Sequence, residues 1–232
     1  MTDFDAKIIE LSKKNEDEKI EQLFEERLKQ EPANIVLLLR LTVLEINPPF
    51  VDYKKCFECL ERVFSLNKDN AIALLLLAYV CTYVWGGGID EVLKNRLITL
   101  HTPDAELNSM LKYTASWFYD NIHENNDPKR EEELLQESIN LYQGHVWNYV
   151  HLADLYINQG HDKEAKELLE TALRNVRKIY SDQEIAAYDS TNIDDFLAER
   201  IQGIYLTKDN FELINERLEK VENVQGRIRN QF

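Results

Sequence analysis

The feature that most constrains the fold is a stretch, residues 145–176, in which two amphipathic helical patterns flank one glycine. The first pattern places apolar residues at spacings of three, one and three, on one helix face: Tyr149, Leu152, Ala153 and Tyr156. The second has the same periodicity: Ala165, Leu168, Leu169, Ala172 and Leu173. Gly160 lies between them, where a chain leaving a helix favours a residue that adopts positive φ. These residues predict a helical hairpin in which small alanines let the two helices pack closely.

Weaker copies of this hairpin are predicted on both sides of it. The N-terminal copy has apolar residues at matching positions: Ile8, Leu11, Ile20, Phe24 and Leu28. The hairpins are expected at residues 1–34, 35–70, 71–103, 104–145, 146–180 and 192–224, followed by a polar tail at 225–232. The segment 181–191 does not fit a repeat and is interpreted as a helix extension and a loop, with a capping box at Ser181 and Glu184. The whole chain, 1–232, is therefore predicted to be a single repeat domain.

Turn-forming residues separate the predicted helices. Proline or glycine supports four of these breaks: Asn47-Pro48-Pro49, Gly86-Gly87-Gly88, Thr102-Pro103 and Asp127-Pro128. In the last two, Thr102 and Asp127 are expected to cap the helix that follows. Lys208-Asp209-Asn210 is expected to be the turn of the last hairpin, between helices that carry Tyr205 and Ile214. Only seven glycines and five prolines are present, and no two-residue periodicity is found, so no β-strand is predicted.

The hairpin at 145–176 resembles the tetratricopeptide repeat (TPR), a helical hairpin of 34 residues that stacks into solenoids. This resemblance implies an all-α fold, a right-handed α-solenoid of about five to six partly degenerate hairpins. It also implies a function in protein binding. Some TPR domains bind the C-terminal carboxylates of chaperones through Lys, Asn and Arg on the inner face of their first helices. Here the equivalent positions are mainly apolar, so chaperone-tail binding is not expected: Val36, Leu39, Val43, Leu75, Tyr79, Val150 and Asp154.

Charge and hydropathy limit the classes of partner. The formal net charge is −15, which disfavours binding to nucleic acid because phosphates would be repelled. The most apolar run, residues 71–85, would span about 22 Å as a helix, whereas a bilayer core needs about 30 Å. The first ten residues lack the apolar core of a signal peptide. We therefore expect a cytoplasmic protein with no membrane or nucleic-acid partner.

No catalytic, metal or cofactor motif is found in the sequence. Cys56 and Cys59 are spaced like a redox or metal pair, but they fall within a predicted helix and lack a second ligand pair, so a packing role is expected. The five histidines show no HExxH spacing, and the three consecutive glycines are not followed by Lys-Ser or Lys-Thr. The chain is therefore predicted not to be an enzyme and to need no cofactor or metal.

Aromatic and acidic residues are the candidates for partner binding. Aromatic anchors bury a large area with few rotatable bonds, and acidic residues attract a basic partner. The acidic candidates belong mainly to a cluster between Asp182 and Glu199 that contains no Lys or Arg. The predicted partner-binding residues are Tyr79, Tyr83, Trp147, Asp154, Asp194, Asp195 and Glu199.

Three functions within the binding class stay open. The first is an adaptor or scaffold that grips a protein partner, basic in character, through a concave groove and acidic surface. The second is a bacterial immunity protein that neutralises a basic toxin such as a nuclease, since a nuclease carries positive charge to hold its substrate. The third is self-association into a homo-oligomer, because four apolar residues would be exposed on the inner face: Val36, Leu39, Val43 and Leu75.

Overall fold

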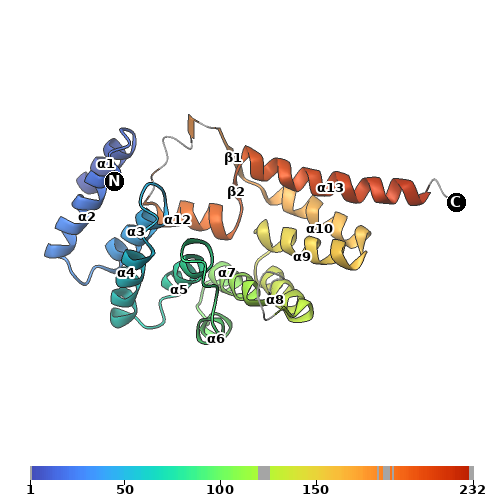
Figure 1. Cartoon of the computed structure of the whole chain (residues 1–232), viewed down its shortest axis with the longest axis horizontal. Coiled ribbons are helices and arrows are strands. Elements are labelled where there is room, and N and C mark those ends of the chain that lie inside the picture. Colours follow the sequence, from blue (N-terminus) through green and yellow to red (C-terminus); the bar gives the residue numbers. More distant parts are fainter. Residues whose placement is uncertain (1, 120–125, 182, 185–188, 190, 230–232) are drawn as a thin grey trace. The chain divides into compact units, whose positions relative to one another are not determined.

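The computed structural model describes residues 2–119, 126–181, 183–184, 189 and 191–229, and the chain forms two compact units (Figure 1). The first unit contains Met1–Arg96 and Asp182–Phe196, and the second contains Leu97–Ser181 and Leu197–Phe232. Each unit is built mainly of antiparallel helical hairpins, so the predicted all-α, TPR-like class of fold is confirmed. The expectation that 1–232 is a single repeat domain stays a prediction.

The first unit is a series of helices in which each packs on the next along the chain. Its elements are α1 (Asp3–Ser12), α2 (Asp17–Gln30), α3 (Ile35–Ile46), α4 (Tyr53–Leu66), α5 (Ala71–Tyr79), the π-helical turn η1 (Val80–Val84) and α12 (Ile193–Phe196). The helix α6 (Glu91–Thr99) contains the point at which the chain passes to the second unit. The short helix α12 packs on α3, so a segment far along the sequence completes the first unit.

Side-chain caps begin several of these helices, among them α3, α4 and α5. The side chains of Asn34, Asp52 and Asn70 accept hydrogen bonds from backbone N–H groups in the first turns of α3, α4 and α5. Such a cap satisfies donors that have no partner inside the helix, and it contributes about 1 kcal/mol. The turn before α4 contains Asn47-Pro48-Pro49, as the sequence predicts.

Buried apolar side chains hold the first unit together. Ile8, Ile20 and Phe24 are fully buried between α1, α2 and α3, and Leu38 and Leu60 are buried where α3 meets α4. Burying one such side chain contributes about 1.5–3 kcal/mol. All of these are positions at which the helical periodicity predicts a core residue.

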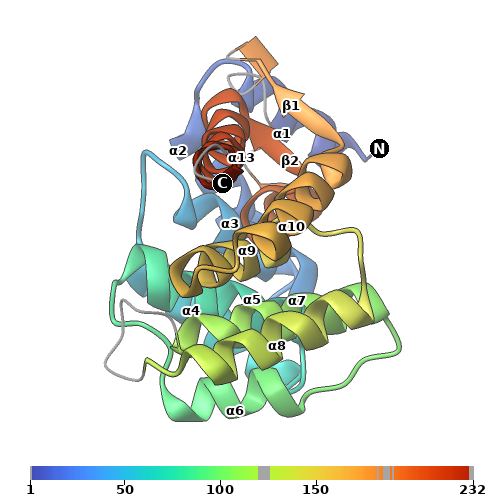
Figure 2. The same cartoon turned by 90° about the vertical axis from the view of Figure 1, so that its right-hand side faces the viewer.

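The second unit contains two helical hairpins, a long helix and two short strands (Figure 2). Its elements are α7 (Ala105–Ser116), the 3-10 turn η2 (Trp117–Tyr119), α8 (Pro128–Leu141), α9 (Trp147–Gln159), α10 (Asp162–Asn175), β1 (Lys178–Tyr180), the π-helical turn η3 (Leu197–Ile201), β2 (Tyr205–Thr207) and α13 (Lys208–Arg229). α7 packs on α8, α8 on α9, α9 on α10 and α10 on α13. The strands β1 and β2 pair in parallel, with Ile179 opposite Leu206.

The hairpin at 145–176 is confirmed. α9 ends at Gly160, whose φ of 79° lies in the left-handed region, and α10 begins two residues later. Ala153, Ala165 and Ala172 are each 0 % exposed where the two helices meet. Small residues at these positions let α9 and α10 approach closely.

The last predicted hairpin is wrong in its turn and in the end of its first helix, which stops at Ile201. Lys208-Asp209-Asn210 forms the first turn of α13, and Tyr205 lies in β2. The chain turns earlier, at Gly203, whose φ is 70°. The prediction that no strand is present is also wrong, and the polar tail predicted from 225 belongs to α13 as far as Arg229.

Two further details correct the sequence analysis. Asp104, not Thr102, caps α7, and the Thr102 side chain instead hydrogen-bonds to Asn108. Asp127 does cap α8, with Pro128 in its first turn, as expected. Most of segment 181–191, including the loop predicted there, lies outside the described residues. Within the ranges that the structure does describe, each helix is too short or too polar to cross a lipid bilayer.

Candidate functional site

The guanidinium group of Arg40 joins three segments of the first unit. Arg40 lies on α3, and its Nη1 donates a hydrogen bond to Asp5 Oδ1 of α1 at 2.8 Å. Its Nε and Nη2 donate to Thr191 Oγ1 at 3.3 and 3.0 Å, and Nη2 lies 3.8 Å from an Asp189 carboxylate oxygen. The guanidinium also lies 5.5 Å from the centre of the Phe24 ring. Arg40 therefore fixes α1, Asp189 and Thr191 against α3.

The carboxyl group of Asp5, the partner of Arg40 on α1, is held in its charged form. Hydrogen bonds from the Thr2 side chain and from Arg40 lower the pKa of Asp5 to about 2. The Thr2 side chain and the Asp5 side chain also form a reciprocal capping box at the start of α1. The Asp5 carboxylate is therefore ionised at neutral pH, as its ion pair with Arg40 requires.

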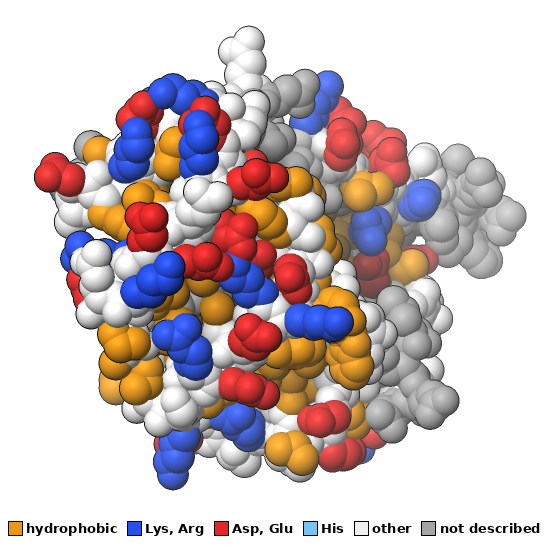
Figure 3. Space-filling model, turned by 60° about the vertical axis from the view of Figure 1, so that its left-hand side comes forward, with side chains coloured by type: hydrophobic (Ala, Val, Ile, Leu, Met, Phe, Trp, Pro, Cys, Tyr) orange, Lys and Arg blue, Asp and Glu red, His pale blue; other side chains and the backbone are white. Residues whose placement is uncertain are grey.

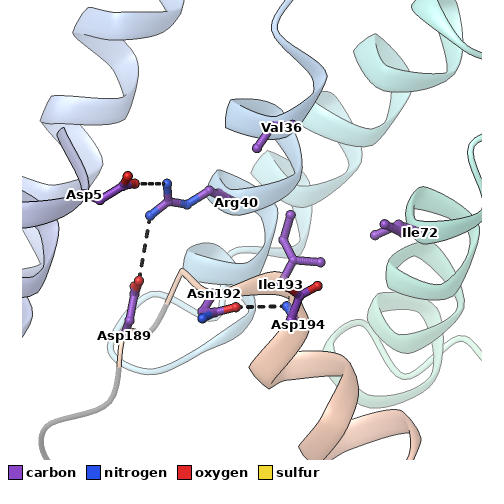
Figure 4. Close-up of a pocket in the computed structure, with 8 residues that line it drawn as sticks. All are labelled: Asp5, Val36, Arg40, Ile72, Asp189, Asn192, Ile193 and Asp194. Atoms are coloured by element: carbon purple, nitrogen blue, oxygen red, sulfur yellow. Dashed lines mark hydrogen bonds and ion pairs between the residues drawn. The ribbon is translucent and has the colours of Figure 1, made fainter. Parts of the chain in front are cut away.

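An open pocket lies beside Arg40 (Figure 4). Its volume is about 430 Å³, and it is lined by residues of α1, α3 and α5 and by residues 189 and 192–194. Its apolar wall is formed by Val36, Ile72 and Ile193, and its polar wall by Asp5, Arg40, Asp189, Asn192 and Asp194. The pocket is therefore amphipathic and lies wholly within the first unit.

The rim of this pocket is set by the start of α12. Asn192 Oδ1 accepts hydrogen bonds from the backbone N–H groups of Asp194 and Asp195, at 3.0 and 3.2 Å. This cap fixes the backbone that carries Asp194. The Asp194 side chain is exposed, and its carboxylate forms no ion pair with any residue that the structure describes. Among the described residues, none therefore neutralises the carboxylate of Asp194 at the rim of the pocket.

Charges on the surface around these elements are mixed in sign. On the face drawn in Figure 3, acidic, basic and hydrophobic side chains are interspersed. A broad surface of one sign would attract any oppositely charged protein, whereas mixed charges require a matched partner.

The predicted site residues of the first unit lie at or near this pocket. Asp194 lines it, and Asp195 follows in α12. The Tyr79 ring contacts the ring of Phe196, also in α12, with their centres 5.0 Å apart. Tyr83 stacks on Tyr79 at 4.9 Å and is 58 % exposed. The structure therefore brings Tyr79 beside α12, which carries Asp194 and Asp195, and Tyr83 contacts Tyr79.

The predicted site residues of the second unit serve mainly internal contacts. Trp147 is partly buried: its Nε1 donates a hydrogen bond to the carbonyl oxygen of Glu199, and a Cβ at Gly203 would lie 2.7 Å from its ring. Asp154 forms an ion pair with Arg217 of α13 at 2.8 Å. These contacts give Trp147 and Asp154 a role in holding the second unit together.

The predicted exposure of four apolar residues is wrong for three of them. Val36 is 58 % exposed, but Leu39, Val43 and Leu75 are at most 3 % exposed. These three positions are buried because α12 packs on α3 and α3 packs on α5. Self-association was predicted from the apolar surface of these four residues, and of the four only Val36 is exposed.

Sequence analysis missed several residues of the pocket: Asp5, Arg40, Ile72, Asp189, Asn192 and Ile193. One of them was detectable. Arg40 is the single charged residue in an otherwise apolar run from Ile35 to Leu44, and a charge there needs a partner. The identity of that partner was not detectable, because Thr191 lies 151 residues later in the chain.

The cysteine pair is part of the core. Cys56 and Cys59 are both buried, and burial raises the pKa of each thiol, that of Cys59 to about 11. Protonated thiols are poor nucleophiles and poor metal ligands. Among the residues that the structure describes, no group of three or more His, Cys, Asp or Glu side chains is placed to hold a metal ion.

One polar cluster of the second unit has the composition of a hydrolase triad. Ser109 Oγ lies 3.2 Å from His145 Nδ1, and His145 Nε2 lies 3.9 Å from a carboxylate oxygen of Glu106. Ser109 and His145 are at most 1 % exposed, so a substrate cannot reach them. Burial lowers the pKa of His145 to about 3, with a smaller effect of Arg177. This cluster is a hydrogen-bonded part of the core.

Comparison with known proteins supports the fold. No protein-family model matches the chain, and no curated protein matches its sequence. Among solved structures, a crystal structure of MamA, a TPR-containing protein, has a TM-score of 0.53 at 19 % identity, and covers 81 % of this chain and 99 % of its own. A second MamA structure has a TM-score of 0.51 at 18 % identity, with 75 % and 93 % covered. At this level of identity the likeness shows a TPR-like fold.

Proposed function

We propose that this protein is a non-enzymatic protein-binding module that acts as an adaptor or scaffold. The observation that carries this proposal is the open pocket of the first unit, which combines the exposed side chain of Val36 and two partly buried isoleucines with a carboxylate, that of Asp194, for which the described residues supply no ion-pair partner. Amphipathic surfaces of this kind suit protein partners, since apolar contacts supply affinity and charges supply specificity. Stacked helical hairpins provide the rigid scaffold on which such a surface is presented.

The immunity-protein alternative rests on the net charge of −15, which would attract a basic toxin. An inhibitor that covers a nucleic-acid-binding surface needs a broad acidic face, and the face drawn in Figure 3 does not supply one, because its charges are interspersed. Self-association is the third candidate, and the burial of Leu39, Val43 and Leu75 removes most of the apolar surface on which it depended.

Affinity capture from a lysate of the native host tests the proposal. The immobilised protein is exposed to lysate at low salt, and bound proteins are eluted with a salt gradient and identified by mass spectrometry. The control is the same chain with Val36→Asp and Asp194→Lys, which removes both features of the pocket. We expect at least one protein that the unmodified chain retains and the control loses. Recovery of no protein by the unmodified chain would contradict the proposal, whereas recovery of the same proteins by both chains would show that they bind outside the pocket.

If the partner is a basic nuclease, the inhibitor alternative is tested directly. Its activity on nucleic acid is measured with increasing amounts of this protein. Stoichiometric inhibition that weakens as salt rises supports the immunity role, whereas binding without inhibition supports the adaptor.

A further inference from the structure

We propose that the pocket beside Arg40 is the docking site for one Arg or Lys side chain of a partner protein, together with an apolar side chain next to it. This inference rests on the proposed function and names the chemistry of the partner. It concerns the pocket that is lined by residues of α1, α3 and α5, by Asp189 and by the neighbouring residues Asn192, Ile193 and Asp194.

The charge of the pocket selects a cation. Its lining contains three carboxylates, those of Asp5, Asp189 and Asp194, and one guanidinium, that of Arg40. Arg40 is already engaged by Asp5 at 2.8 Å and Asp189 at 3.8 Å. The exposed carboxylate of Asp194 has no ion-pair partner among the residues that the structure describes, and it is therefore the available anchor for an incoming cation.

The apolar side chains of the pocket suit the aliphatic stem of a long basic side chain. Val36 is 58 % exposed, and Ile72 and Ile193 are partly buried around the same space (Figure 4). Arg and Lys bury their aliphatic stems along apolar surface while the charged end finds a polar partner. Because apolar side chains and an exposed carboxylate line the same pocket, a basic side chain with an apolar neighbour matches both.

The pocket is also organised before a partner arrives. Arg40 ties α1 and Thr191 to α3, and Asn192 caps the backbone that presents Asp194. A preformed site binds with a smaller entropic cost than one that must be assembled. The pocket can therefore hold a single side chain as a specific anchor.

The test uses hexylguanidinium as a probe of the cation and its stem, with hexylurea as the neutral analogue. Each is titrated into the isotope-labelled full chain, and backbone amide shifts are followed by NMR. We expect hexylguanidinium to shift amides of residues that line the pocket, and hexylurea to bind at least five-fold more weakly. Equal binding of the two compounds, or shifts confined to other residues, would overturn the inference.

Variants locate the two contacts. Asp194→Asn is expected to weaken hexylguanidinium about five-fold, while Asp69→Asn, an equal charge change at another exposed position of the first unit, has no effect. Val36→Ser is expected to weaken hexylguanidinium about three-fold and to leave methylguanidinium unchanged, because only the former has a long stem. An equal effect of Asp69→Asn and Asp194→Asn would overturn the inference.

Two outcomes separate this inference from the proposed function. If the chain captures a protein partner and Asp194→Asn captures it with equal affinity, the pocket is not the docking site, although the protein-binding function stands. Sedimentation is the second readout. A dimer that Asp194→Asn dissociates would overturn the assignment to a separate partner, because the occupant would then be a second copy of this chain.

Discussion

Glu45, on α3, is a buried carboxyl group whose protonation is expected to control part of the stability of the protein. Its side chain is 1 % exposed and lies 3.3 Å from Lys55 Nζ, and Lys55 also pairs with Glu21 and Glu25. Three carboxylates thus share one ammonium group. Burial raises the pKa of Glu45 to about 7, Lys55 opposes this effect, and Glu21 adds to it.

The direction of the pH dependence follows from this raised pKa. Folding favours the protonated form of Glu45, so its stabilising contribution is complete below the ordinary pKa of 4.5 and is lost as the pH rises through about 7. At about 1.4 kcal/mol for each pH unit, the difference between these two pKa values corresponds to about 3 kcal/mol. Glutamine resembles the protonated carboxyl and does not titrate, so Glu45→Gln should remove this loss.

Urea unfolding at pH 5 and pH 8 measures the effect. At each pH, the gain is the free energy of unfolding of Glu45→Gln minus that of the unmodified protein. We expect this gain to be about 2–3 kcal/mol larger at pH 8 than at pH 5. Glu58→Gln, at an exposed position of α4, is the matched control and should show no such pH-dependent gain. The reasoning is refuted if Glu45→Gln gains no more at pH 8 than at pH 5, or if Glu58→Gln shows the same gain.

Three further perturbations test other parts of the structure. Arg40→Met should lower the free energy of unfolding by about 2 kcal/mol, measured in urea, because Asp5 and Thr191 lose a charged hydrogen-bond donor; an unchanged value would contradict the role assigned to Arg40. Gly160→Ala should cost about 1 kcal/mol in thermal unfolding, since φ is 79° there and no neighbour lies within 4 Å of the new Cβ; a stabilised variant would contradict the left-handed turn. Cys56 and Cys59 should resist a thiol reagent at pH 8 until denaturant is added, and rapid labelling of the native protein would show that they are not buried.

The hairpin at 145–176 was predictable because its determinants are local. The alternation of large residues with Ala153 and Ala165, and the position of Gly160, depend on helix geometry within about one repeat. The same argument applies to Asp127, which begins α8 with a side-chain cap and a following proline. Where a feature is set by neighbours in the sequence, periodicity and capping predict it.

The end of the chain was less predictable because its structure depends on distant contacts. Lys178 pairs with Tyr205 across the two-stranded sheet, and each strand has only three residues, too few to show a periodicity. The left-handed turn at Gly203 precedes β2, whereas the polar triplet 208–210 opens α13. A polar triplet is compatible with either a turn or the first turn of a helix, so composition alone could not decide between them.

The candidate site was predicted in part. Asp194 was identified from local acidity, and Val36 from its place on the presumed inner face. Leu39 and Val43 were expected to be exposed beside it, but α12 packs on the helix that carries them. Arg40 acquires its role from contacts with segments before and long after it in the chain. Helix periodicity predicts which residues share a face, but it does not predict which other helix covers that face.

The most direct test of the account is the affinity of the purified chain for the partner recovered by capture. The dissociation constant is measured by calorimetry from 50 to 400 mM NaCl, for the unmodified chain and for Asp194→Asn. The account predicts saturable binding at one site, weaker at high salt, with a loss of about five-fold for Asp194→Asn at the lowest salt and a smaller loss at the highest. The absence of saturable binding to any purified candidate at 50 mM NaCl would contradict the claim that this protein is a protein-binding module.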